Sequence, residues 1–368
     1  MRTLEVLLRH GWLDGERWKA LESELAAALG DRGDYGLLPA VMPELCRAEA
    51  DEAWLNTLNR WLPREAAATG AQLWLAQQQP PAVDAKSRFA RLRWRVHQGL
   101  GQPGAEPTPE TPDGLVTVAM SCFNNAATLE AAALSVLGQT HTNLELVIVD
   151  DASTDGSAAV AQALARQDAR VKLHVNPVNQ GTYANRNRVW AESRAEYFCC
   201  LDADDIALPG RLAQQLAALQ AQPGWMAVIS LWVRMTAEGC PVAMNVEQGG
   251  FAHRSVSTMM LRREPVLKAL GFWDGVRFEA DSEYMNRLTT VFGTQALGWQ
   301  DDVVALALSR LGSLTQDPLT GLDDVYGPSP MRLAYRQAWQ DWHRSGERLY
   351  MPQSPQPRPF AAPPEMLA

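Results

Sequence analysis

The sequence predicts an α/β protein, with a mainly parallel sheet flanked by helices and a small all-helical domain before it. Beyond about residue 114, short continuous apolar runs alternate with helical patterns, which is typical of a parallel sheet buried on both faces. Before residue 101 the chain has helical patterns and little strand character. With 368 residues, 46% of them hydrophobic and 20% charged, the chain is long enough for two domains of ordinary globular composition.

The helical accessory domain is expected to span residues 1–100. In "GERWKALESELAAALG", Trp and Leu recur at helical spacing, and the final Gly suits a helix end. The arginines of "RFARLRWRVH" suit either a solvated helix face or anionic lipid, so a peripheral membrane or protein contact through this domain is left open. Residues 101–114, "GQPGAEPTPETPDG", are rich in Pro, Gly and acid and are expected to form a linker.

The second domain is expected to span residues 115–320. Its predicted strands are "LVTVAMSCF", "LELVIVDD", "VKLHV", "EYFCCLDADD" and "WMAVISLWV". Its predicted helices are "ATLEAAALSVLGQ", "SAAVAQALARQ", "TYANRNRVWAES" and "PGRLAQQLAALQAQ". Residues 321–368 are expected to add a C-terminal helix and a Pro-rich tail, which is disordered or draped over the surface.

Two of the predicted strands end in carboxylates. Asp150 and Asp151 end the second strand, and Asp202, Asp204 and Asp205 follow the fourth. If the strands are parallel, all five acids lie at one edge of the sheet, where ligands of such folds bind. The acids could cap the following helices, as Asp205 could do for the helix that Pro209 starts. Alternatively they hold a cation, because gathered carboxylates repel one another and oxygen ligands suit Mg²⁺ or Mn²⁺.

Several sequence blocks together resemble a known family. The blocks are "VTVAMSCFNNAATL", "LELVIVDDASTDGS", "NQGTYANRN", "LDADD" and "GFWDGVRFEADSEYMNRL". Their order and spacing resemble the family 2 glycosyltransferases with a GT-A (Rossmann-like) fold, over about residues 114–317. The resemblance implies an inverting, metal-dependent transferase of polysaccharide biosynthesis that moves a hexosyl or N-acetylhexosaminyl group. It also implies a nucleotide-sugar donor, a UDP-sugar by family frequency, and a hydroxyl acceptor on a glycan, a lipid-linked precursor or a protein.

The resemblance assigns residues to the nucleoside of the donor. Cys122, Phe123 and Asn124 stand where the family places the Thr-Tyr-Asn that lines the nucleobase pocket. Asp150 and Asp151 fall on the family's Asp pair, which holds the base or the ribose. Because Cys122 and Phe123 replace Thr and Tyr, the contacts to the base are expected to differ in detail from those of the family.

The resemblance also assigns the chemistry. Arg186 falls on the family's arginine near the base and pyrophosphate. Asp202 and Asp204 fall on its metal motif, and Asp204 is expected to be the direct ligand. Asp281 falls on the general base. These roles suit the reaction, since a divalent cation offsets the charge of a leaving diphosphate. A positioned carboxylate that deprotonates the acceptor hydroxyl contributes about 10² to 10⁴ in rate.

The base assignment departs from the family at one point. The usual Glu-Asp pair is Ala280-Asp281 here, with Glu279 and Glu283 as neighbouring acids that could be confused with the base. Weaker candidates lie elsewhere. His253 and Arg254 are candidates to face the acceptor, and the segment "LSRLGSLT", which contains Arg310 and Ser313, occupies the place of a loop that closes over the diphosphate.

Composition limits the other function classes. A formal net charge of -9 disfavours a general nucleic-acid binder, which needs excess Lys and Arg. The five cysteines show no CxxC pair and no regular spacing with His, so they are interpreted as reduced thiols of a cytosolic protein. The N-terminal residues lack the apolar core of a signal peptide, and no segment approaches the roughly 20 apolar residues of a membrane span. We therefore expect a cytoplasmic protein, with peripheral contact at the inner membrane face left open.

Two alternative functions were weighed against the transferase. A sugar nucleotidyltransferase needs a Gly-rich, cationic phosphate loop after the first strand, and "SCFNNAATLE" contains neither Gly nor Lys or Arg. A non-catalytic nucleotide-sugar-binding or scaffold protein would be expected to lose the metal acids or Asp281, and all of them are present. Both alternatives fit the sequence less well than the transferase.

Overall fold

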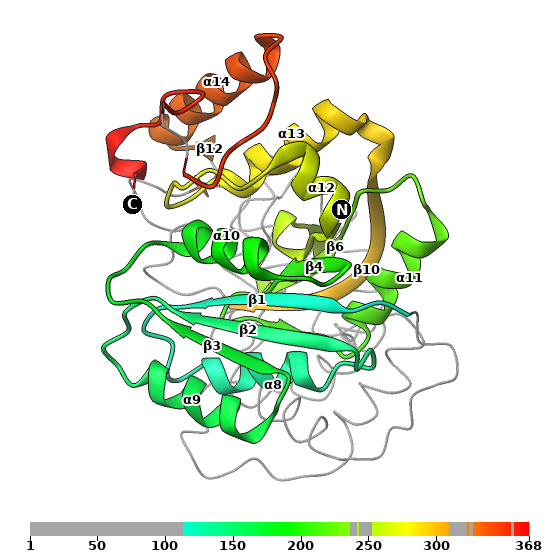
Figure 1. Cartoon of the computed structure of the whole chain (residues 1–368), viewed down its shortest axis with the longest axis vertical. Helices are drawn as coiled ribbons and strands as arrows, with labels where there is room; N and C mark the ends of the chain where they lie inside the picture. The colour runs from blue at the N-terminus through cyan, green and yellow to red at the C-terminus, as the bar shows by residue number, and fades with distance from the viewer. Residues whose placement is uncertain are drawn as a thin grey trace, which may run out of the picture.

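A computed structural model describes residues 113–235, 241–242, 252–308, 322–323, 327–354 and 357–367 of the chain (Figure 1). The predicted helical domain of residues 1–100 and nearly all of the predicted linker lie outside the described residues. The candidates Arg310 and Ser313 and the side chain of His253 also lie outside them.

The first half of the main sheet is parallel. Its strand order is β3-β2-β1-β4, and each neighbouring pair runs in the same direction. The strands are β1 (Val116–Cys122), β2 (Leu144–Asp150), β3 (Val171–Val175) and β4 (Tyr197–Cys200). Nearly every residue of β1 and β2 is buried, as expected for strands without apolar-polar alternation.

The second half of the sheet mixes directions. From β4 the order continues β9-β6-β10-β5, and only β6 and β10 are parallel to each other. The strands are β5 (Ile206–Ala207), β6 (Ala227–Met235), β9 (Met260–Arg262) and β10 (Leu297–Leu308). Short strands β7 (Pro241–Val242) and β8 (Ala252–Arg254) add to β6, and β11 (Leu322–Asp323) pairs with β12 (Gly327–Pro328). The predicted α/β class is confirmed, and the complete sheet is mixed.

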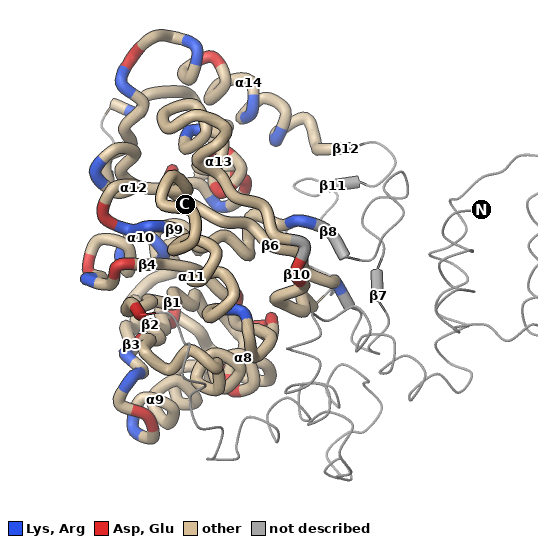
Figure 2. The backbone as a smooth tube through the Cα atoms, turned by 90° about the vertical axis from the view of Figure 1, so that its right-hand side faces the viewer, with Lys and Arg blue, Asp and Glu red and all other residues tan. Residues whose placement is uncertain are grey.

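Helices cover both faces of this sheet, as Figures 1 and 2 show. On one face lie α8 (Leu129–Leu137), α9 (Ser157–Gln167) and α11 (Arg211–Ala221). On the other lie α10 (Thr182–Glu192), α12 (Arg263–Leu270), α13 (Ala280–Phe292) and α14 (Pro330–Arg344). Short 3₁₀ turns are η3 (Val256–Thr258), η4 (Thr294–Ala296) and η5 (Pro364–Met366). Among the described helices, none is both long and apolar enough to cross a membrane.

The core between the sheet and α10, α12 and α13 is built on aromatic side chains. The Trp190 ring meets Phe198 edge-on at 4.7 Å and Trp273 edge-on at 5.3 Å, and Tyr284 stacks on Trp273 at 4.2 Å. Such pairs add about 0.5–1.5 kcal/mol each beyond the apolar area that they bury. This core fixes α10 and α13, the two helices that carry candidate site residues, against β4.

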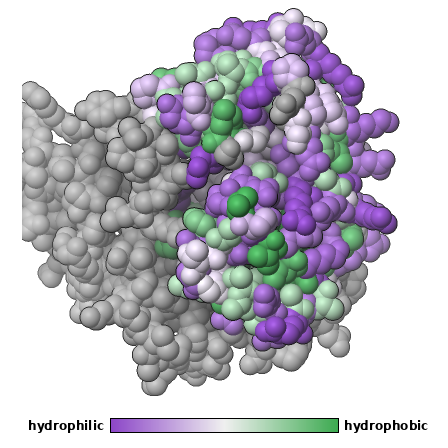
Figure 3. Space-filling view, turned by 60° about the vertical axis from the view of Figure 1, so that its left-hand side comes forward, coloured by the Kyte–Doolittle hydropathy of each residue, from purple (hydrophilic) through white to green (hydrophobic). Residues whose placement is uncertain are grey.

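The outer surface is mostly polar. On the face seen in Figure 3, hydrophilic residues cover most of the described surface and hydrophobic ones form small separate groups. The exposed large hydrophobic side chains are scattered along the described chain, and Phe123 is 48% exposed at the end of β1. Scattered exposure of this kind is normal for a folded domain.

The C-terminal segment contributes to the core. On α14, Tyr335, Trp339 and Trp342 are buried, and in the tail Met351 and Phe360 are buried as well. Backbone hydrogen bonds pair Met351 with both sides of the turn that follows α12, because its N–H donates to Leu270 and its carbonyl accepts from Phe272. The described part of the Pro-rich tail is therefore packed, not disordered.

We expect Gly271→Ala to destabilise the protein at the junction between the tail and the domain. Gly271 ends α12 with φ +75, and a Cβ there would lie 2.1 Å from the carbonyl oxygen of Met351. The positive φ alone costs an L-residue about 1–2 kcal/mol, and the overlap adds to it. Gly275→Ala is the matched control, because a Cβ at Gly275 meets open space. Urea unfolding curves measure both variants, and equal losses would contradict the assigned packing.

Candidate active site

The carboxylates predicted to share one edge of the sheet do so. Asp150 ends β2 opposite Cys122 at the end of β1, and β1 also pairs in parallel with β4. After β4 the chain stays beside β1, since the N–H of Leu201 donates to the Ala119 carbonyl at 3.1 Å. Asp202 follows directly. The carboxyl edge of the parallel strands is thus acidic on both sides of β1.

Asp151 holds the loop that leads into α10. Its Oδ1 accepts from Nδ2 of Asn176 at 2.8 Å and from the N–H of Gln180 at 2.9 Å, and its Oδ2 accepts from the N–H of Gly181 at 2.8 Å. The residue is 3% exposed. Because backbone N–H groups ahead of a helix need acceptors, this carboxylate fixes where α10 begins.

Asp150 has a different environment. It is 1% exposed, and its Oδ2 accepts a single bond of 3.3 Å from the N–H of Ser153. Its Oδ1 is buried with no hydrogen-bond donor from the described residues. Since an unpaired buried oxygen is costly, Asp150 is the member of the pair that has an acceptor left for a ligand.

The residues at the end of β1 also differ in their exposure to solvent. Cys122 is 1% exposed, and burial raises the pKa of its thiol to about 11, so the thiol is neutral. Phe123 and Asn124 are exposed. Asn124 adopts φ 53, and its Oδ1 accepts from the N–H of Thr154 at 2.8 Å. The ring of Phe123 is therefore the large apolar surface that this turn presents to solvent.

Arg186 places a buried positive charge beside the acids. It is 7% exposed, its Nη2 donates to Oδ1 of Asp202 at 2.9 Å, and its guanidinium lies over the ring of Tyr183 at 5.2 Å. Burial opposes the charge, but the neighbouring Cys200, Asp202 and Tyr183 groups raise the pKa of Arg186 above its ordinary value. The guanidinium is thus a permanent cation at the end of β4.

Asp205 does not cap the following helix. Helix α11 begins after Gly210 without a side-chain cap, and Oδ1 of Asp205 accepts from the N–H of Leu308 on β10 at 3.0 Å. Burial, and then the charges of Asp204 and Asp202, raise the pKa of Asp205 well above its ordinary value. The pKa of Asp205 is thus raised mainly by burial, and the two neighbouring carboxylates add to the shift.

Asp202 and Asp204 fit a divalent cation that also binds phosphate. Both are half-buried, the side chain of Asp202 is 43% exposed, and the cluster has an excess of negative charge. Within the part of the chain that the structure describes, no three His, Cys, Asp or Glu side chains gather to hold a metal by themselves. Mg²⁺ and related ions commonly take one or two carboxylates and complete their shell with water and substrate phosphate. The donor set suits that arrangement.

Asp281 lies in the first turn of α13 and contacts α10. Its N–H lies 3.3 Å from the hydroxyl oxygen of Tyr183, and its Oδ1 accepts from the N–H of Ser282 at 2.8 Å. Burial raises the pKa of the Asp281 carboxyl, the charge of Arg186 lowers it, and Glu279 raises it further. Tyr183 is not among the site residues predicted from the sequence. The available signal was its spacing of three residues from Arg186, which places both on one helix face.

Glu279 is engaged elsewhere. It is 4% exposed with φ 74, and its two carboxylate oxygens pair with Arg332 and Arg336 of α14. A positive φ is strained for Glu and persists only where the surroundings enforce it. Here two arginines hold the residue that precedes α13.

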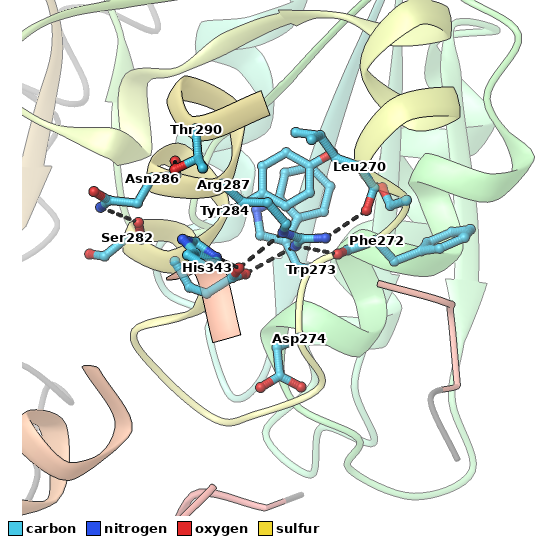
Figure 4. Close-up of polar contacts among 12 residues, drawn as sticks. Leu270, Phe272, Trp273, Asp274, Ser282, Tyr284, Asn286, Arg287, Thr290 and His343 are labelled. Atoms are coloured by element: carbon cyan, nitrogen blue, oxygen red, sulfur yellow. Dashed lines mark hydrogen bonds and ion pairs between the residues drawn. The ribbon is translucent and has the colours of Figure 1, made fainter. Parts of the chain in front are cut away.

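Glu283 is also engaged, through the buried guanidinium of Arg287. The two form hydrogen bonds of 2.9 and 3.0 Å, and His343 approaches the same carboxylate at 2.9 Å. Arg287 also donates to the carbonyls of Leu270 and Phe272 at 2.6 and 2.8 Å, as Figure 4 shows. Glu283 and Arg287 are 0% exposed. This network anchors α13, and its carboxylate is not available to a substrate.

The weaker candidate Arg254 lies on β8, with its guanidinium 5.4 Å from the centre of the Trp299 ring. Trp299 is 46% exposed. The structure thus places Arg254 on an antiparallel strand of the second half of the sheet.

The chain resembles known glycosyltransferases. Residues 117–238 match the sequence model of Glycosyl transferase family 2. An uncharacterized glycosyltransferase of Haemophilus influenzae is 36% identical over 102 residues, 28% of this chain and 41% of that protein. The UDP-Glc:alpha-D-GlcNAc-diphosphoundecaprenol beta-1,3-glucosyltransferase WfgD of Escherichia coli is 33% identical over 107 residues, 29% of this chain and 42% of that protein. The matched region thus spans less than half of either relative.

The chain is also similar to a solved structure. It is the mannosyltransferase PcManGT from Pyrobaculum calidifontis in complex with GDP-Man and Mn²⁺, with a TM-score of 0.43 and 21% identity, covering 68% of this chain and 69% of that one.

The two acids that end β2 are expected to respond differently to the same substitution. Asp151→Asn places an NH₂ against N–H donors and should cost about 1–3 kcal/mol of unfolding free energy for the unsatisfied group. Asp150→Asn disturbs one weak bond and should cost less than half as much. Urea unfolding measures both. A larger loss in Asp150→Asn would mean that the roles of the two carboxylates are reversed.

Proposed function

We propose, from the premise that residues 117–238 belong to glycosyltransferase family 2, that this chain transfers a sugar with inversion from a nucleotide-sugar donor to an acceptor hydroxyl. The observation that carries the proposal is the continuous contact from Asp202 through Arg186 and Tyr183 to Asp281. It joins an acidic donor edge to a carboxylate whose pKa is raised. Donor activation and proton removal need groups placed at such separate positions.

The nucleoside of the donor is proposed to bind at the ends of β1 and β2. The exposed ring of Phe123 supports stacking of a base, and the unpaired buried Oδ1 of Asp150 supports a bond from a base N–H or a ribose hydroxyl. Arg186 lies beside the position proposed for the diphosphate. We propose UDP as the nucleotide, which agrees with the UDP-Glc named for the Escherichia coli relative.

Asp202 and Asp204 are proposed to hold Mn²⁺ or Mg²⁺ together with the diphosphate. When bound, the cation offsets the negative charge that develops on the leaving nucleoside diphosphate. The protein's own contribution is a fixed frame. Arg186 holds Asp202 at 2.9 Å, so one ligand keeps its orientation and the permanent cation adds a second positive charge near the departing phosphate.

Asp281 is proposed to be the general base. Its carboxylate takes the proton of the acceptor hydroxyl as that oxygen bonds to the anomeric carbon and the bond to the donor phosphate breaks. The ion pairs of Glu279 and Glu283 support this choice among the three neighbouring acids. The acceptor is proposed to be a glycan, a lipid-linked precursor or a protein, and the group transferred a hexosyl or N-acetylhexosaminyl residue.

Nucleotide binding should depend on the divalent cation. UDP with Mn²⁺ is expected to raise the melting temperature more than UDP alone or than GDP or CDP with Mn²⁺, because Asp202 and Asp204 would hold the cation and the cation would attract the diphosphate. At one hundred times the dissociation constant the stabilisation is about 2.7 kcal/mol. Asp202→Asn with Asp204→Asn should lose the increment due to the metal, while the exposed Asp341→Asn on α14 keeps it. A folded protein that binds no nucleotide with any cation would rule out the transferase.

Removing the proposed base should strongly reduce turnover and leave donor binding intact. Asp281→Asn is expected to lower kcat by about 10² to 10⁴, measured as UDP released from UDP-sugar, with nucleotide affinity unchanged. In the wild type, kcat should fall on acidification at a pH above the ordinary Asp range, because a base with a raised pKa is protonated there. Asp341→Asn serves as the control. Unchanged turnover in Asp281→Asn would show that another group is the general base.

A further inference from the structure

Tyr183 joins the two helices that carry the candidate site. It lies in the first turn of α10, is 5% exposed, and its hydroxyl oxygen is 3.3 Å from the N–H of Asp281 at the start of α13. Within the described residues, this hydrogen bond links α10 directly to the residue proposed as the base.

We propose that Tyr183 is a positioning residue for Asp281, holding its main chain and its carboxylate together through one hydroxyl group. A tyrosine hydroxyl has one proton and accepts at its oxygen. The oxygen accepts from the N–H of Asp281 at 3.3 Å, and in this proposal the hydroxyl proton is donated to the Asp281 carboxylate. The inference rests on the proposed function of Asp281 and adds a residue that the family resemblance does not assign.

Asp281 is held from two directions. Ser282 donates its N–H to Oδ1 at 2.8 Å from within α13, and Tyr183 approaches from α10. The first contact lies within the same helix turn and would move with it, so it cannot fix Asp281 relative to the donor. Among the hydrogen bonds of the described residues, the contact from α10 links Asp281 itself to the helix that reaches the sheet edge, and catalytic groups must be held in the reactive geometry to within fractions of an ångström.

The same turn of α10 reaches the donor side. Arg186 follows Tyr183 by three residues, lies over its ring at 5.2 Å and pairs with Asp202 at 2.9 Å. A cation over an aromatic face is attracted to the ring. The ring and the hydroxyl of Tyr183 therefore contact opposite parts of the site, and α10 sets the distance between them.

The charges around Asp281 give the direction of the effect. Burial raises the pKa of Asp281, Arg186 lowers it, Glu279 raises it, and the Ser282 N–H and Tyr183 hydroxyl lower it. Burial and the charge of Asp281 raise the pKa of Tyr183 well above its ordinary value, so its proton stays available for donation. Loss of the hydroxyl removes a bond to the charged carboxylate, and the pKa of Asp281 then rises.

Tyr183→Phe tests the inference by two measurements on the full chain. The first is the titration of Asp281 by NMR in protein labelled with ¹³C at the Asp carboxyl carbons, with the resonance assigned by Asp281→Asn. The second is the dependence of kcat on pH with UDP-sugar. We expect the Asp281 pKa and the acidic limb of kcat to move to higher pH together. We also expect kcat to fall by roughly 10- to 100-fold, the cost of a small misplacement, with donor KM nearly unchanged.

Tyr284→Phe is the matched control. Tyr284 is buried, lies on α13 and donates its hydroxyl proton to the Gly271 carbonyl at 3.2 Å, so the variant loses one buried hydrogen bond of the same helix. It should leave the Asp281 titration and the acidic limb at their wild-type positions. An equal shift in Tyr284→Phe would overturn the inference, as would an unchanged Asp281 pKa in folded Tyr183→Phe.

The inference and the proposed function fail in different ways. If the wild type releases no UDP, the transferase proposal fails, and the NMR titration still decides whether Tyr183 holds Asp281. If Tyr183→Phe does not fold, 3-fluorotyrosine at position 183 replaces it. The fluorinated ring is a stronger donor, so the pKa of Asp281 is expected to fall. An unchanged value would overturn the inference.

Discussion

The buried charge of Arg186 constrains the rest of the site. A guanidinium that is 7% exposed has lost most of its hydration and needs compensating partners nearby. The structure supplies them from both directions along α10, with the Asp202 carboxylate at the end of β4 and the ring of Tyr183 one turn earlier. Because α10 packs on β4 through the rings of Trp190 and Phe198, the helix that carries this cation is fixed to the core. The acids at the sheet edge and Asp281 on α13 therefore both lie near the same buried positive charge.

The position of Asp281, the residue proposed as the base, depends on α14, which follows it in the chain. Glu279, held at φ 74 by Arg332 and Arg336 of α14, sets the entry into α13, and the buried Arg287 fixes the helix to the turn after α12. The residues from 279 onward lie beyond residues 117–238, which match the family. Breaking such buried pairs on one side leaves an uncompensated charge and costs about 3–5 kcal/mol. The C-terminal segment is therefore part of the structure that orients Asp281.

The sequence predicted the elements better than the contacts. Continuous apolar runs indicated the strands β1, β2, β3, β4 and β6, and the parallel pairing then brought the acids to one edge. Other features depend on partners distant in sequence. Asp151 and Asp150 look equivalent in "VIVDD", yet only Asp151 meets the N–H groups of residues 180 and 181. Asp205 lies where an acid could cap a helix, but the backbone of β10 reaches it first. The burial of Met351 in a Pro-rich tail has no periodic signal.

Arg186 also explains how the acids that follow β4 and Asp281 on α13 can both be ionised although they lie close together. Burial and like charges raise the pKa of Asp205 well above its ordinary value, which shows that this part of the protein disfavours an ionised carboxylate without a nearby cation. At the carboxyl edge of the sheet, Asp202 is paired with Arg186, and on α13 the same guanidinium lowers the pKa of Asp281, which burial and Glu279 raise. A base needs a pKa near the working pH and must still be ionised there. One buried cation between the two carboxylates meets both needs, because it lowers the energy of each charged form.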